Sequence, residues 1–134
     1  MSLPPLPHSP TPFTVAQSAL EALLQGLQTG QWYSFRDRLT EDVTLWFPKE
    51  PFPGVNQGKE QTIAVLQSLP WNPAVAITVE HVTCNGTTVM LELRLNRPGG
   101  NLPGFERAAI AFEIRGEQVS AIQPYLLLCH PTHP

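Results

Sequence analysis

Apolar residues recur in the first forty residues with a helical period. One set has the three- and four-residue spacing of a single buried helix face: Val15, Ala19, Leu20, Leu23, Leu24 and Leu27. Thr14 can cap this helix, and Gly30 can end it. Residues 31–39 then predict a second, shorter helix with Trp32, Phe35 and Leu39 on its apolar side.

The pattern changes to a period of two after residue 42. Val43, Leu45 and Phe47 alternate with Thr44 and Trp46, as in a strand with one buried face. The prolines at 48, 51 and 53 and the glycines at 54 and 58 predict a loop over the end of a sheet. A helix restarts after residue 58, with apolar positions at 63, 66 and 69.

The second half of the chain is rich in strand signals. Residues 74–84 and 87–95 flank Asn85-Gly86, a pair typical of a two-residue hairpin turn. Residues 105–114 and 119–128 flank another tight turn at 115–117. The result is four consecutive antiparallel strands. Helices that precede a run of strands indicate an α+β fold, in which the helices pack on one face of a curved, mostly antiparallel sheet.

Composition narrows the function classes. The 134 residues fit one domain, which we place at 13–128 between a proline-rich flexible arm at 1–12 and a flexible tail at 129–134. A net charge of −3 with scattered Lys and Arg argues against nucleic acid and against a membrane surface. We find no signal peptide and no apolar run long enough to span a bilayer, so we expect a cytoplasmic protein.

Three stretches of the chain resemble a known family. These are LEALLQGLQTGQWYSFRDRLTEDVTLWFP, PGVNQGKEQTIAVL and the final GEQVSAIQPYL. In order and spacing they are similar to the nuclear transport factor 2-like superfamily, in its SnoaL-like polyketide cyclase branch, over residues 13–128. The resemblance implies a cone-shaped, cystatin-like α+β barrel, an apolar pocket between the helices and the concave sheet, and a homodimer formed through the convex face.

The comparison with this superfamily can be extended to the positions of its catalytic residues. Ketosteroid isomerases of this superfamily use a tyrosine on the first helix, an aspartate at the end of the first strand and an acid on a late strand. These positions correspond here to Leu23, to Phe47 or its neighbour, and to Ile110 or Ala109. All are apolar, and proton transfer needs a group that carries the proton, so the resemblance disfavours isomerase chemistry. In a carotenoid-binding branch, the gripping Tyr and Trp correspond to Leu23 and Phe112, neither of which donates a hydrogen bond.

We expect a hydrophobic pocket built from inward-facing side chains of helices and strands. Its predicted lining is Leu20, Leu23, Leu27, Phe47, Phe52, Leu66, Leu91, Leu93, Ala108, Ile110, Phe112 and Ile122. Glu106 is in phase with three of these residues and is the candidate general acid-base group, because partial burial would raise the pKa of its carboxyl. Alternatively, Glu106 lies at the exposed start of its strand and pairs with an arginine or a lysine.

Other polar groups have structural interpretations. Glu92 and Arg94 are expected on the outer face, unless the strand register slips by one residue and brings them into the pocket. His81 beside Glu80 could be a base oriented by a carboxylate, but adjacent strand residues point to opposite faces. Cys129, His130 and His133 lack the spacing of a structural zinc site, and we predict neither metal nor cofactor.

The sequence therefore favours a SnoaL-like protein that binds a small apolar ligand. An enzyme of cyclase or isomerase type that uses Glu106 is the first alternative, and a non-catalytic dimeric assembly module is the second.

Overall fold

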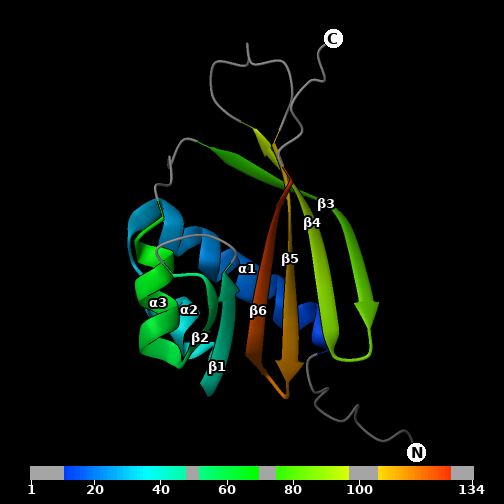
Figure 1. Cartoon of the computed structure of the whole chain (residues 1–134). Helices are drawn as coiled ribbons and strands as arrows, with labels where there is room; N and C mark the ends of the chain where they lie inside the picture. Colours follow the sequence, from blue (N-terminus) through cyan, green and yellow to red (C-terminus); the bar gives the residue numbers. More distant parts are fainter. Residues whose placement is uncertain (1–10, 48–51, 70–74, 97–105, 128–134) are drawn as a thin grey trace, which may run out of the picture.

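The computed structural model describes residues 11–47, 52–69, 75–96 and 106–127. Apart from one added short strand at residues 54–57, its elements follow the order expected from the sequence (Figure 1). They are α1 (Pro12–Thr29), α2 (Tyr33–Asp37), β1 (Leu39–Phe47), β2 (Gly54–Gln57), α3 (Lys59–Gln67), β3 (Ala76–Asn85), β4 (Thr88–Asn96), β5 (Glu106–Arg115) and β6 (Gln118–Leu127). The α+β prediction is confirmed.

The six strands form one curved sheet in the order β2-β1-β6-β5-β4-β3. Strands β3 to β6 are successive antiparallel neighbours, as the hairpin signals predicted. Strand β1 pairs with β6 in parallel, and this pairing joins the first strand of the chain to the last described one. The amide of Val119, at the start of β6, donates to the Arg38 carbonyl at 2.7 Å, beside the first pair of this ladder, Leu39 and Val119.

Helix α1 crosses one face of the sheet and packs on β4, β5 and β6, while α3 packs on β1 and β2 (Figure 1). The helices and the inner faces of the strands enclose one hydrophobic core. Its largest fully buried side chains include Phe35, Phe112, Leu39, Leu45 and Leu91. Burial alternates along β4, where Val89, Leu91, Leu93 and Leu95 are buried, so the register is the one that turns the leucines toward the helices. Glu92 and Arg94 consequently lie on the outer face.

The turn from α1 into α2 depends on two glycines. Gly30 adopts a left-handed conformation at φ 78° and caps α1 through a bond from its amide to the Gly26 carbonyl. Gly26 itself faces the indole of Trp32, and a Cβ at position 26 would lie 2.5 Å from the ring. The side chain of Trp32 is buried and meets Phe35 edge-on, with ring centroids 6.1 Å apart. Absence of a side chain at position 26 therefore lets α2 fold back against α1.

Three local predictions were wrong. Leu39, which we expected on the second helix, is the first residue of β1, because α2 ends at Asp37. The N-cap of α1 is Thr11, whose hydroxyl accepts from the Thr14 amide at 3.2 Å, and not Thr14. Pro12 is compatible with this start because the first turn of a helix needs no amide donor. In addition, residues 54–57, which we assigned to a loop, form β2 and pair with β1 at the sheet edge. The predicted arm at 1–10 and the tail at 129–134 lie outside the described residues.

A β-bulge in β3 corrects the prediction for His81. The register of β3 against β4 shifts between Val79 and His81, which leaves Glu80 without a direct partner. Glu80 forms an ion pair with Arg94 at 2.9 Å on the outer face, and exposed His81 lies opposite Glu92 on the same face. The simple alternation that we assumed for residues 80 and 81 is therefore broken at this point.

Candidate functional site

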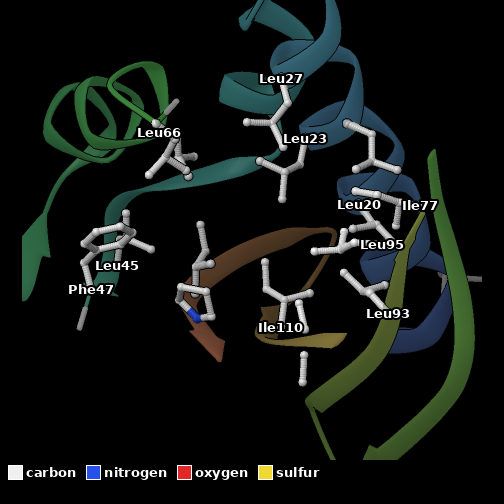
Figure 2. A pocket seen from close by; sticks show the side chains of 16 residues that line it. Leu20, Leu23, Leu27, Leu45, Phe47, Leu66, Ile77, Leu93, Leu95 and Ile110 are labelled. Atoms are coloured by element: carbon white, nitrogen blue, oxygen red, sulfur yellow. The ribbon is translucent and has the colours of Figure 1, made fainter. Parts of the chain in front are cut away.

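An apolar cavity of about 130 Å³ lies between α1, α3 and the inner face of the sheet. Figure 2 shows the side chains of all sixteen lining residues, which converge on it from α1, α3 and the strands. They are Leu20, Leu23, Leu24, Leu27, Leu45, Phe47, Leu66, Leu69, Ile77, Leu93, Leu95, Ala108, Ala109, Ile110, Ile122 and Pro124. Every one of these side chains is hydrocarbon, so the wall carries no side-chain hydrogen-bond donor, acceptor or titratable group.

Helix α1 supplies one wall of the cavity. Leu20, Leu23 and Leu27 are spaced by three and four residues, and side chains at this spacing project from the same face of a helix. Figure 2 shows all three directed toward the cavity, with Leu66 of α3 facing them from the side. The same helical spacing that places these leucines on the buried face of α1 also places them along the cavity.

The strands supply the opposite wall near one end of the sheet. Phe47 is the last residue of β1, Ile77 is the second of β3, and Leu95 is the last but one of β4. Pro124 lies near the end of β6, where it pairs with Ile110 of β5. The cavity therefore lies where β1, β4 and β6 end and where β3 and β5 begin.

Pro124 also marks the limit of the β1–β6 ladder. Parallel pairing between these strands extends to Leu45 and Ile122, two residues before the proline. A proline has no amide to donate, and inside a sheet it is tolerated where a neighbouring strand no longer needs that donor. Leu45 contacts the cavity at this last pair, and Phe47 and Pro124 contact it beyond the end of the ladder.

Most of the twelve predicted pocket residues line this cavity, and three do not. The nine that line it are Leu20, Leu23, Leu27, Phe47, Leu66, Leu93, Ala108, Ile110 and Ile122. Leu91 and Phe112 share the inner face with them but are almost completely buried farther along their strands, in the solid core. Phe52 is half-buried and packs against the core without reaching the cavity.

Seven lining residues were not predicted from the sequence: Leu24, Leu45, Leu69, Ile77, Leu95, Ala109 and Pro124. Several of them carried a usable signal. Leu45 and Leu95 continue the alternation of Phe47 and Leu93, and Leu24 adjoins Leu23 on the apolar side of α1. Ala109 is out of phase with its inward-facing neighbours, and only the family resemblance, as the alternative to Ile110, pointed to this position.

The candidate acid-base residue, Glu106, begins β5. Its backbone pairs with Leu95, a residue that lines the cavity. The side chain of Glu106 lies outside the described part of the structure, so the position of its carboxyl relative to the cavity stays a prediction. Cys129, His130 and His133 also lie outside the described residues.

Charged groups of the described residues are found on the surface and away from the cavity. Arg115 donates to Asp42 at 3.0 Å, Lys59 pairs with Glu41 at 3.2 Å, and Arg36 pairs with Glu60. Half-buried Glu113 accepts hydrogen bonds from the hydroxyls of Thr87 and Thr88, and these bonds lower the pKa of its carboxyl below the ordinary value. These interactions link neighbouring elements outside the cavity.

The described residues contain no group of three or more histidine, cysteine or acidic side chains that could hold a metal ion. In the same residues, no helix is both long and apolar enough to cross a bilayer.

A curved sheet wrapped over helices, with an apolar cavity between them, defines the cone-shaped α+β class. Within that class, residues 20–122 match the family model of the SnoaL-like domain, and the chain belongs to this family. The family is part of the nuclear transport factor 2-like superfamily, so the resemblance inferred from the sequence is confirmed. No curated protein matches the chain.

Solved structures support the same assignment. The chain is similar to an NTF2-like protein from Anabaena variabilis, with 34% identity over 86% of this chain and 88% of that one and a TM-score of 0.72. It shares its fold with a candidate ketosteroid isomerase from Kribbella flavida, at 16% identity over 90% and 83% of the two chains and a TM-score of 0.64. A candidate isomerase from Bacillus subtilis is similar at 17% identity over 88% and 90%, with a TM-score of 0.66.

Proposed function

We propose that the protein binds a small apolar ligand in the cavity between α1, α3 and the sheet. The observation that carries the proposal is a cavity of about 130 Å³ with an entirely hydrocarbon side-chain lining. Ligand sites are typically concave and mostly apolar. An empty apolar cavity is also unfavourable, because the side chains around it lack packing partners on that side. A bound ligand would recover part of this loss through dispersion contacts.

The residues at the isomerase positions of the superfamily favour binding over catalysis. The resemblance assigns these positions to Leu23, to Phe47 or its neighbour, and to Ile110 or Ala109, and the four named residues line the cavity. A hydrocarbon side chain can neither move a proton nor donate a hydrogen bond to an oxyanion. The cavity is therefore suited to holding a hydrophobic molecule more than to transforming it.

Native mass spectrometry of the purified protein tests the proposal. We expect a hydrophobic small molecule at about one per subunit, which denaturation releases for identification. The variant Ala108→Leu should reduce this occupancy because its larger side chain fills the cavity. Ala111→Leu is the matched control, since it makes the same change on the same strand but outside the cavity lining. An empty natural protein that also fails to take up added hydrophobic compounds would contradict the proposal.

The second candidate function is a cyclase or isomerase activity with Glu106 as the general acid-base group. It is favoured by the backbone pairing of Glu106 with Leu95 at the cavity end of β5. Turnover of a polycyclic ketone that Glu106→Gln abolishes would support it. Glu92→Gln, which removes an exposed carboxylate from the outer face, should leave such turnover unchanged. Equal loss in both variants would contradict a specific role for Glu106.

We also propose that two copies associate through the outer face of the sheet, as in the predicted homodimer. Trp46, Val55 and Tyr125 expose 38%, 68% and 37% of their surface, and the strand register puts them on the side away from the helices. Sedimentation analysis should give the mass of two chains. Trp46→Glu should shift the mass toward one chain, whereas Tyr33→Glu on α2 should not.

The cytoplasmic location likewise remains a prediction from the sequence.

A further inference from the structure

The cavity walls also limit what kind of molecule can enter. A cavity of this volume has room for water, but a buried water needs two to four polar partners to be stable. The lining side chains offer none, and the backbones of β4, β5 and β6 behind them pair with one another in the β4–β5 and β5–β6 ladders. Water inside would therefore lose hydrogen bonds that bulk water provides, so the lining disfavours water in the cavity.

The same argument applies to any polar atom of a ligand. A carbonyl or hydroxyl oxygen placed inside would leave water without gaining a hydrogen bond, and this desolvation is unfavourable. A hydrocarbon group meets no such penalty, since it exchanges water for the side chains of residues such as Leu23, Leu66 and Ile110. The hydrocarbon walls therefore disfavour the polar groups of a ligand, although they offer no atom that could bind such a group specifically.

Volume sets a second limit. An engineered cavity of about 150 Å³ lined by leucine, isoleucine and phenylalanine stays dry and binds benzene or xenon. The cavity here is slightly smaller and has a similar lining. It is large enough for one six-membered ring or a short branched chain, and too small for a fused three-ring skeleton.

We propose that the cavity accepts only an unsubstituted hydrocarbon group of about the size of one ring, so that any polar part of the natural ligand remains outside it. This inference rests on the proposed function and specifies its ligand. It separates the protein from a binder that holds a polycyclic ketone by its oxygen. The natural ligand is then a compound with a hydrocarbon end, or a small hydrocarbon as a whole.

Methyl NMR of the full chain, titrated with matched probes, tests the inference. The pairs are benzene with phenol and cyclohexane with cyclohexanone, and phenanthrene tests the size limit. We expect benzene and cyclohexane to shift the methyl signals of Leu23, Leu66 and Ile110 to saturation. Phenol and cyclohexanone should have dissociation constants at least about tenfold higher than their hydrocarbon partners. Burial of their oxygen without a hydrogen-bond partner is unfavourable by more than the free energy that corresponds to a tenfold change in Kd. Phenanthrene should produce no saturable shift of these methyls.

Variants and alternative outcomes complete the test. Ala108→Leu should abolish the benzene shifts while Ala111→Leu retains them. If Ala108→Leu does not fold, the location of the shifts in the natural protein still decides the site. Phenol or cyclohexanone binding as tightly as its hydrocarbon partner, or phenanthrene saturating the cavity methyls, would overturn the inference but leave ligand binding intact. Absence of binding by every probe would overturn both the inference and the proposed function.

Discussion

Replacement of Gly26 by alanine should destabilise the protein, although alanine is the better helix former. Gly26 is buried within α1, and the indole of Trp32 occupies the space where a side chain would project. An added methyl group would lie 2.5, 2.6 and 2.7 Å from three atoms of that ring. The ring is only 7% exposed and packs edge-on against Phe35, so it has little room to move away.

Two opposing terms set the size of the effect. Alanine is favoured over glycine inside a helix by about 1 kcal/mol. Forcing a methyl group into a packed core costs about 1–3 kcal/mol. The three contacts are about 1 Å shorter than the usual distance of about 3.5–4.0 Å between carbon atoms, so we place this cost at the upper end. The free energy of unfolding should then fall by about 2 kcal/mol.

Urea unfolding followed by circular dichroism measures this change, and a second background isolates its cause. In a Trp32→Leu protein the indole is absent, so Gly26→Ala should lose its penalty and raise stability by up to about 1 kcal/mol. The sign of the substitution thus reverses between the two backgrounds. Stabilisation of the natural chain by Gly26→Ala, or an equal loss in both backgrounds, would refute the steric argument.

Two further predictions concern polar groups. Because the hydroxyls of Thr87 and Thr88 lower the pKa of Glu113 in the folded state, their contribution is complete above the ordinary value of 4.5 and is lost as the pH falls through the lowered pKa. Unfolding curves across this range should show a weaker pH dependence for Glu113→Gln than for the natural chain, and equal slopes would count against it. Buried Asn56 donates to the Phe52 carbonyl at 3.1 Å and accepts from Gln61 at 3.0 Å, so Asn56→Ala should cost about 1–3 kcal/mol in thermal unfolding. Gln61→Ala removes only one of these bonds and should cost less; the opposite ranking would contradict this assignment.

The periodic spacing of apolar residues predicted the helices and strands, because burial of one face of an element requires apolar residues at that spacing. The alternation from Val89 to Leu95 identified both β4 and its inner face, and Asn85-Gly86 identified the turn before it. Periodicity failed where the backbone departs from regular geometry. The bulge at Glu80 adds a residue that alternation does not anticipate, and β2 follows prolines that normally interrupt a strand.

The limits of the cavity were harder to predict for a different reason. Phase along a strand shows which face a residue occupies, but not how far along the strand the neighbouring helix remains in contact. Leu91 and Leu93 have the same phase, yet Leu91 is in solid core and Leu93 lines the void. The difference depends on the packing of α1 and α3 over the sheet, and these contacts join residues far apart in the sequence.

The central place of β6 has a consequence for biosynthesis. This strand is the last described one along the chain, yet it lies between β1 and β5 and is the common neighbour of both. While the ribosome has not yet released residues 118–127, β1 and β5 each lack a partner on the edge that β6 will occupy, and these exposed edges can pair with other nascent chains. Completion of the sheet therefore has to follow synthesis of its last strand, and truncation before Gln118 should yield an aggregating fragment rather than a smaller folded domain.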